Sequence, residues 1–265
     1  MKETSAQKLY LTKLKRQRRR VTALRLFIFA GFLLLWELAA RRGWIDSFIF
    51  SSPSGLARTF SDMIAGQSLA SHIGVTMAET LLSFFLVTVL AVSAAVLLWL
   101  FPGFARVSEP YLVVLNSLPK SALAPLLIVW LGANMRTIIV AGMSVALFGS
   151  ILNLYTGFRE VDPDMLKLIR TLGGGRGTAL RKVVLPASVP YLISTFKVNI
   201  GLCLVGVVIG EFIGARKGLG YLIIYGTQVF KLNMVILSIV ILCVIAVVLY
   251  ALLGLLEKRY LKRRG

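Results

Sequence analysis

The order of apolar and polar positions divides the chain into six long apolar stretches separated by shorter charged segments. A helix needs about 20 apolar residues to cross the hydrocarbon core of a bilayer. The pattern predicts membrane-spanning helices over about 24–40, 78–101, 110–131, 137–157, 188–213 and 233–256. We therefore expect an all-α, polytopic membrane protein. Its single transmembrane domain covers 24–257, between basic tails at 1–23 and 258–265.

Composition agrees with this class. Hydrophobic residues make up 57% of the chain, charged residues only 15%, and the mean hydropathy is +0.83, whereas soluble domains carry about a quarter charged residues. The two cysteines lie in apolar stretches, Cys-x-x-Cys spacing is absent and there is one histidine. We therefore expect neither a disulfide framework nor a metal site.

Lysine and arginine are distributed unevenly between the two sides. With the N-terminus inside, the inner segments hold 21 of them and the outer segments seven, with Lys120 and Lys197 inside spans. Basic residues collect in cytoplasmic loops. The bias predicts that both termini are cytoplasmic. It also explains the net charge of +19 without a nucleic-acid partner, and membrane lipid is the expected surrounding.

The longest inner loop, residues 158–187, has a pattern unlike its surroundings. Asp162 suits a helix N-cap and Pro163 the first helical position. Three glycines end that helix, and a second short helix is expected from about Thr178 to Leu185. The first helix presents an apolar face made by Met165, Leu166, Leu168, Ile169 and Leu172. A phosphate-binding loop would need Gly-Lys-Ser/Thr after a strand, which is absent, so a structural turn and a docking element for a partner remain.

The outer segment 41–71 shows a weaker helical pattern. Leu56, Phe60, Met63 and Ile64 have the spacing of an amphipathic helix lying on the outer surface. In the fifth span, Gly201, Gly206 and Gly210 predict close helix packing at a dimer interface or in the core.

Ionisable groups within spans are costly and are candidates for function. Lys120 lies between Pro119 and Pro125, where a broken helix can leave backbone groups facing a cavity. It could attract an anionic substrate, or it could reach an interface or pair with Glu79 or Glu109.

Five other polar residues complete the candidate substrate pathway. Lys197 could instead extend to the inner interface, and Glu211 could pair with Arg216 or Lys217. The amides could line the pathway or hydrogen-bond between helices. The candidates are Asn116, Lys120, Asn153, Lys197, Asn199 and Glu211.

The inner loop resembles a motif of the permease subunits of bacterial ATP-binding-cassette importers. That motif reads Glu-Ala-Ala, three residues, Gly, nine residues, Ile, one residue, Leu-Pro. Here nine residues separate Gly173 from Val183, and Leu185-Pro186 follow after one more. The first three positions fall on Lys167-Leu168-Ile169 and depart from the motif. Segments such as "LPKSALAPLLIVWLG" and "VVIGEFIGARKGLGYLI" look like the nitrate, sulfonate and taurine branch.

The resemblance implies a six-helix type I importer permease fold in a bacterial cell membrane. It implies two ATPase subunits that bind ATP and Mg²⁺, so no cofactor is expected in this chain, which is no enzyme itself. A homodimer of the permease and an extracytoplasmic substrate-binding protein are the other expected partners. Coupling to the ATPase is expected through residues 160–186, with the contacts made by Met165, Leu166, Lys167, Ile169, Arg170, Gly173, Leu185 and Pro186.

The resemblance also implies a small anionic substrate such as an aliphatic sulfonate, taurine or nitrate. A secondary transporter or channel without an ATPase is the alternative, and it predicts inverted repeats with paired broken helices. Neither is visible in the sequence. A membrane-embedded enzyme would need a catalytic cluster, and the carboxylates are scattered.

Overall fold

The structure, a computed structural model, describes residues 5–66 and 68–262. Within these ranges the chain is helical, with turns and short connections but no strand, as the all-α expectation requires. The helices are α1 (Ser5–Arg41), α2 (Ser47–Phe50), α3 (Pro53–Ala65), α4 (Ser68–Leu100), α5 (Pro102–Ser117), α6 (Lys120–Leu131), α7 (Met135–Arg159), α8 (Pro163–Thr171), α9 (Arg176–Ala179), the π-helix η1 (Leu180–Val184), α10 (Leu185–Ala187), α11 (Val189–Gly214), α12 (Leu219–Gln228) and α13 (Leu232–Lys262).

Five of these helices, α1, α4, α7, α11 and α13, are long and apolar enough to cross a membrane. The α5–α6 pair makes a sixth span if it is counted as one, but it bends by 93°. The cause is local: Leu118 precedes a proline and adopts an extended conformation, because the proline ring disfavours the helical one. The third span, predicted at 110–131 with a break at Pro119, Lys120 and Pro125, is therefore a pair of helices, and the first of them already begins at Pro102.

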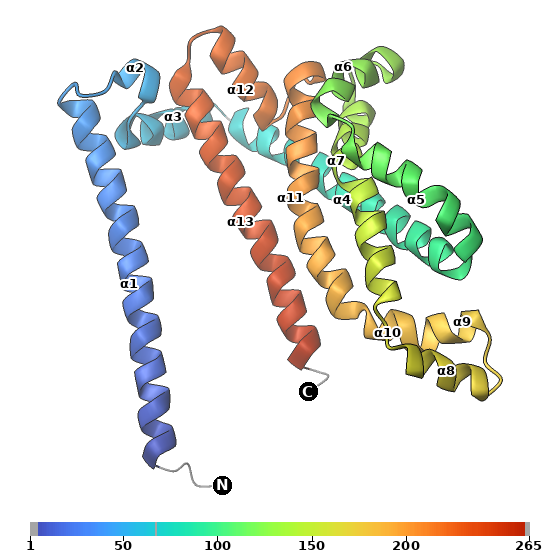
Figure 1. The fold of residues 1–265 in the computed structure, drawn as a ribbon. Helices are drawn as coiled ribbons and strands as arrows, with labels where there is room; N and C mark the ends of the chain where they lie inside the picture. The colour runs from blue at the N-terminus through green and yellow to red at the C-terminus, as the bar shows by residue number, and fades with distance from the viewer. Residues whose placement is uncertain (1–4, 67, 263–265) are drawn as a thin grey trace.

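Two other spans are longer than the apolar pattern indicates. α4 begins at Ser68, ten residues before the predicted start at 78, and the described part of the basic N-terminal tail continues α1 as one helix. Figure 1 shows α1 standing apart from the other helices, which it approaches only near α2 and α3. Its Ser5 end, the Lys262 end of α13 and the α8–α10 region all lie toward the same end of the molecule (Figure 1).

The centre of the bundle is α7, which packs against both α4 and α11. A Cβ added to Gly206 of α11 would lie 2.8 Å from the Cα of Gly142 in α7, so the two backbones touch there. One added to Gly210 would meet Ile138 at 3.2 Å, whereas one added to Gly201 would meet nothing within 4 Å. The predicted close packing is confirmed within the bundle for Gly206 and Gly210, whereas Gly201 has no such contact within the chain, and its packing at a dimer interface stays a prediction.

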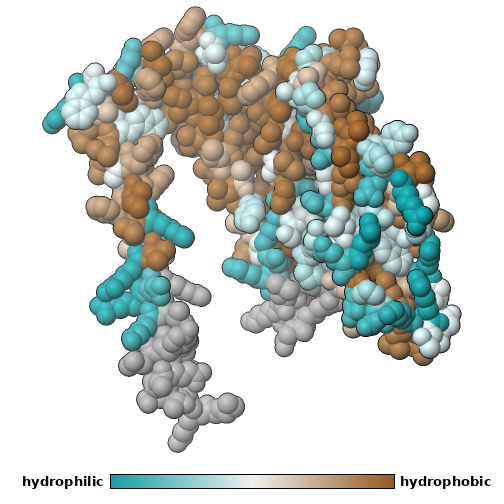
Figure 2. Space-filling model, viewed as in Figure 1, coloured by the Kyte–Doolittle hydropathy of each residue, from teal (hydrophilic) through white to brown (hydrophobic). Residues whose placement is uncertain are grey.

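The predicted amphipathic helix of the outer segment is α3. Leu56 is buried, while Phe60 and Ile64 are exposed. The backbone N–H of Ser54 donates to Glu37 of α1 at 3.0 Å, which ties the start of α3 to the outer end of the first span. Figure 2 shows apolar side chains over much of the long helices and hydrophilic ones around α8–α10.

Candidate functional site

The first helix of the inner loop begins as the sequence predicts. Asp162 is the N-cap of α8 and accepts a hydrogen bond from the backbone N–H of Asp164 at 2.8 Å, with Pro163 at the first position. This cap satisfies one of the free N–H groups at the helix start.

The turn after α8 requires glycine at two positions, for a different reason at each. Gly173 has φ +79°, and its N–H donates to the carbonyl of Arg170, while that of Gly174 donates to Ile169 at 2.8 Å. These two bonds form a Schellman motif, which needs a left-handed residue after the helix. Gly174 is constrained by space, because a Cβ there would lie 2.6 Å from the side chain of Ile169. The glycine run is thus a tight helix end.

The second half of the inner loop is longer than expected and contains a π-helix. Helical structure runs from Arg176 to Ala187 instead of 178–185, with η1 in its middle. Pro186 cannot donate a backbone hydrogen bond and its ring crowds the carbonyl four residues earlier, which accounts for the widened turns just before it. Leu180 and Val184 are buried against α4, α5 and α7, so this half is attached to the spans.

The apolar face of α8 divides into two rows. Leu166 packs against the buried cluster of α4, α5, α7 and η1, which we call the inner core, and Ile169 covers the glycine turn. Met165, Leu168 and Leu172 point outward and are 56%, 59% and 75% exposed. They form the outer stripe of α8, since residues three and seven apart share a helix face. Leu168 and Leu172 are missing from the predicted coupling contacts, although their spacing to Met165 is the signal that identifies them.

The remaining predicted coupling residues have separate positions. Lys167 is exposed and pairs with Asp164 on the same helix at 2.8 Å. Arg170 lines a cavity beneath α8, Leu185 packs against the inner core, and Pro186 is partly buried in α10.

Three of the predicted pathway residues come together beside the break between α5 and α6. The ammonium group of Lys120 donates to the carbonyls of Leu115 at 2.6 Å and Asn116 at 3.0 Å. These carbonyls at the end of α5 lack helical partners. The Asn116 side chain lies against Gly149 of α7, and Asn153, one turn further along α7, is exposed on the same face. An amide, an ammonium group and a second amide therefore share one surface.

The predicted residues on the inner part of α11 contact neighbouring helices instead. Lys197 forms an ion pair with Glu257 of α13 and lies over the ring of Tyr250. Asn199 is buried and accepts a hydrogen bond from Ser150 of α7 at 2.7 Å, which is the interhelical alternative. Of the alternatives for Lys120, pairing with Glu79 or Glu109 is wrong, because the ion pairs of the described residues do not include Lys120.

Glu211 holds the segment that follows α11. Its buried carboxylate accepts hydrogen bonds from the hydroxyl of Thr76 at 2.7 Å and from the backbone N–H of Gly220 at 2.5 Å. The hydroxyl of Thr76 in turn accepts from the N–H of Leu219 at 2.8 Å. The expected pair with Arg216 or Lys217 is wrong, since none of the ion pairs of the described residues contains Glu211. This buried network joins α4, α11 and α12.

These features define a class of protein. The chain is a polytopic bundle with a broken span bearing polar residues, and a capped amphipathic helix projects from its longest loop. Such a chain is a membrane transport permease. Residues 88–262 match the family of binding-protein-dependent transport system inner membrane components, and the chain belongs to that family. It is thus a permease subunit of an ATP-binding-cassette importer, which excludes the secondary transporter or channel.

Similar proteins carry related descriptions. An ABC transporter permease protein of Haemophilus influenzae is 29% identical over 89% of this chain and 96% of its own length. The aliphatic sulfonates transport permease protein SsuC is 26% identical in Bacillus subtilis, over 89% of this chain and 86% of the relative. In Escherichia coli it is 28% identical, over 86% of this chain and 84% of the relative.

Solved structures share the fold. A chain of the MetNI methionine ABC transporter, in an inward-facing conformation, matches with TM-score 0.64 and 20% identity over 75% of this chain and 97% of that one. A chain of a bacterial ABC transporter involved in the import of the acidic polysaccharide alginate matches with TM-score 0.67 and 13% identity, over 94% and 99%. The predicted type I importer permease fold is confirmed.

Proposed function

We propose that this permease couples ATP hydrolysis by two separate ATPase subunits to the import of a small anion, through docking of α8 into a groove on each ATPase. The observation that carries the proposal is the outer stripe of Met165, Leu168 and Leu172. A helix of nine residues is marginal in water by itself. An apolar helix face in a groove is a recurring mode of recognition.

The attachment of the inner loop suits transmission of force. The second half of the loop is buried against the inner core at Leu180 and Val184, while α8 carries the free apolar face. A displacement of α8 by closing ATPases would therefore be passed to α4, α5 and α7. Gly173 and Gly174 keep the connection short.

The proposed orientation places both termini and the inner loop in the cytoplasm. Its support is the distribution of lysine and arginine, with 21 in the inner segments and seven in the outer ones. In addition, the Ser5 end of α1, the Lys262 end of α13 and the α8–α10 region lie toward the same end of the molecule (Figure 1). Reporter fusions after Gly66 should read as external and fusions after Gly265 as cytoplasmic. A cytoplasmic signal after Gly66 would contradict the orientation.

The proposed assembly is a homodimer of this chain. α1 touches the bundle mainly through α2 and α3, and the most apolar part of this helix, within Arg19–Arg41, has no buried residue. The α5–α6 pair also leaves a wide face exposed, including Tyr111 and Trp130. A second copy related by two-fold symmetry is the common way for identical chains to cover such faces, and a pathway would then lie between the two. Native mass spectrometry that finds one permease per complex would refute the homodimer.

The proposed substrate is a small sulfonate-type anion, delivered by an extracytoplasmic binding protein. The sulfonate permeases among the relatives support this class, and the cationic Lys120 beside Asn116 and Asn153 offers a pathway surface that attracts anions. Other relatives are described as transporting riboflavin and formylaminopyrimidine, so these define the competing substrates.

Transport by the reconstituted importer tests the proposal. Proteoliposomes containing the permease and its ATPase should take up taurine or ethanesulfonate when ATP and the loaded binding protein are present. Riboflavin should not be taken up. Uptake that continues without ATPase subunits would contradict the coupling role, and uptake of riboflavin alone would contradict the substrate class.

A further inference from the structure

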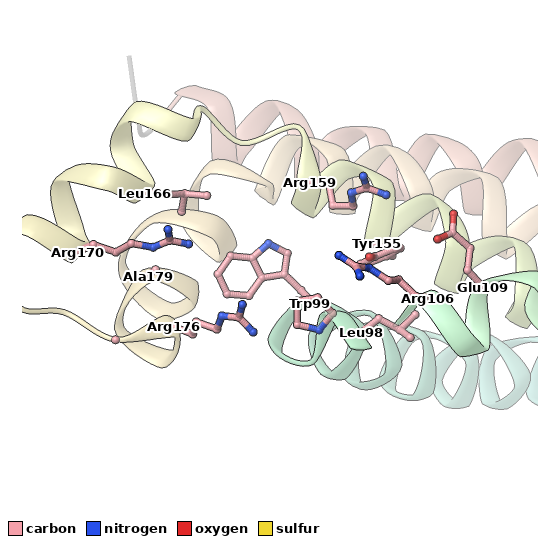
Figure 3. A pocket seen from close by; sticks show the side chains of 12 residues that line it. Leu98, Trp99, Arg106, Glu109, Tyr155, Arg159, Leu166, Arg170, Arg176 and Ala179 are labelled. Atoms are coloured by element: carbon pink, nitrogen blue, oxygen red, sulfur yellow. The ribbon is translucent and has the colours of Figure 1, made fainter. Parts of the chain in front are cut away.

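A cavity of about 310 Å³ lies between the inner loop and the adjoining ends of α4, α5 and α7. Four arginines from four different elements line it: Arg106 of α5, Arg159 of α7, Arg170 of α8 and Arg176 of α9. Figure 3 shows Arg106, Arg170 and Arg176 pointing toward the indole ring of Trp99. Residues far apart in the sequence thus bring positive charge to one place.

Among the described residues, carboxylates balance only a small part of this charge. Glu109 is the one acidic residue in the lining. Among the described residues, the ion pairs join other side chains, namely Arg41–Glu37, Lys167–Asp164 and Lys197–Glu257. Arg176 donates to the carbonyl of Leu100 at 3.0 Å, and Arg159 lies over the ring of Tyr155, contacts that position the guanidinium groups without cancelling their charge. Like charges gathered in this way repel one another, so an anion between them stabilises the arrangement.

The chemistry of the lining selects the kind of anion. Guanidinium groups are planar, always charged and present paired N–H donors that match the oxygens of phosphate. A water molecule occupies about 30 Å³ in the liquid, so the cavity of about 310 Å³ has room for a phosphate-type group with part of its substituent.

The position of the cavity relates it to the membrane surface. The apolar span of α4 ends at Leu100, directly after Trp99. Tryptophan is enriched where a span meets the lipid headgroups, the cytoplasmic leaflet is rich in anionic lipids, and basic pockets between spans on that side bind their headgroups. The cavity therefore lies where a lipid phosphate is available.

We propose that this arginine cavity binds a phosphate-type anion, supplied by the headgroup of an anionic phospholipid of the inner leaflet or by free phosphate in the cytosol. The proposal rests on the cytoplasmic orientation given above but not on ATPase docking. Arg170 and Arg176 belong to the inner loop, whereas Arg106 and Arg159 belong to the spans. A bound anion would therefore hold α8 and α9 against the transmembrane bundle.

The test uses the purified full-length chain in detergent. Native mass spectrometry measures binding of phosphatidylglycerol against phosphatidylcholine, and tryptophan fluorescence measures titration with inorganic phosphate, with Trp99→Phe identifying the signal of the cavity. The variant Arg106→Gln/Arg170→Gln removes two exposed charges from the lining. The control Arg181→Gln/Lys182→Gln removes two exposed charges from the same loop outside the lining.

The double variant should weaken binding of the anionic probe by about tenfold or more, because hydrogen bonds to charged groups are lost, while the control should bind as the wild type does. Selective loss of phosphatidylglycerol identifies the lipid as the source. Loss of a phosphate-dependent change in Trp99 fluorescence identifies the free anion. If the double variant is not recovered in folded form, Arg106→Gln alone is compared in the same way.

Two results would overturn the proposal. In the first, the variant and the control bind each probe equally well. In the second, the wild-type chain binds neither inorganic phosphate nor phosphatidylglycerol in preference to phosphatidylcholine. The arginines would then pair with a carboxylate of a protein or stabilise the fold, without binding a phosphate-type anion.

Discussion

Shortening two side chains of the outer stripe should separate the permease from its ATPase. Leu168→Ala and Leu172→Ala each remove three carbon atoms, and a buried CH₂-sized group contributes about 0.8 kcal/mol. Weighted by exposures of 59% and 75%, the loss on docking is about 1.4 kcal/mol for Leu168 and about 1.8 kcal/mol for Leu172. Together they predict a Kd raised by about two hundredfold.

The assay is titration of the ATPase subunit onto the permease in nanodiscs. The fold should be little affected, because both side chains lie mostly in solvent and have little packing within the chain to lose. The matched control is Leu252→Ala/Leu256→Ala, where the exposures are 53% and 59% but the residues belong to α13 and not to the inner loop. An unchanged Kd in the stripe variant, or an equal loss in the control, would refute the reasoning.

The turn after α8 gives a second prediction. Gly173→Val should destabilise the loop by about 1–2 kcal/mol and lower substrate-stimulated ATP hydrolysis, whereas Gly173→Asn should have a smaller effect because asparagine tolerates φ +79°. Equal rates of ATP hydrolysis in the two variants would contradict this. Lys120→Gln keeps a donor for the carbonyls of Leu115 and Asn116 but removes the charge, so sulfonate uptake should fall while assembly persists, and Lys120→Arg should restore uptake. Normal uptake by the glutamine variant would limit Lys120 to capping α5. Gly218→Ala should lower the melting temperature in a thermal-shift assay, because φ is +115° and an added Cβ would overlap the Glu211 carboxylate; an unchanged melting temperature would contradict the need for glycine there.

The apolar pattern predicts what is local along the chain. The N-cap at Asp162 and the glycine end of α8 follow from residues within one or two turns, and the spans follow from the length of apolar runs. The same pattern misplaces the start of α4 by ten residues. Polar residues in this part of the helix, such as His72 and Thr76, accept hydrogen bonds from the start of α12 and the residue before it. These partners are distant in sequence, so the local apolar pattern does not reveal them.

The partners of polar groups could not be predicted, because they depend on which helices become neighbours. Glu211 has Arg216 and Lys217 nearby in sequence, yet its partners are Thr76, 135 residues away, and a backbone N–H. Similarly, the apolar face of α8 is visible in the sequence, but its division into packed and exposed rows depends on where α9 and η1 lie. The arginine cavity could not be predicted for the same reason, because its four arginines come from four elements that become neighbours only in the fold.

The most direct test of coupling through α8 is site-specific photo-cross-linking in the assembled transporter. A photoreactive phenylalanine analogue placed at Leu168 or Leu172 should cross-link to the ATPase subunit, while one placed at Leu166, which packs inward, should cross-link only within the permease. ATPase cross-links from Leu166 but not from Leu168 or Leu172, or none from any of the three, would contradict docking through the outer stripe.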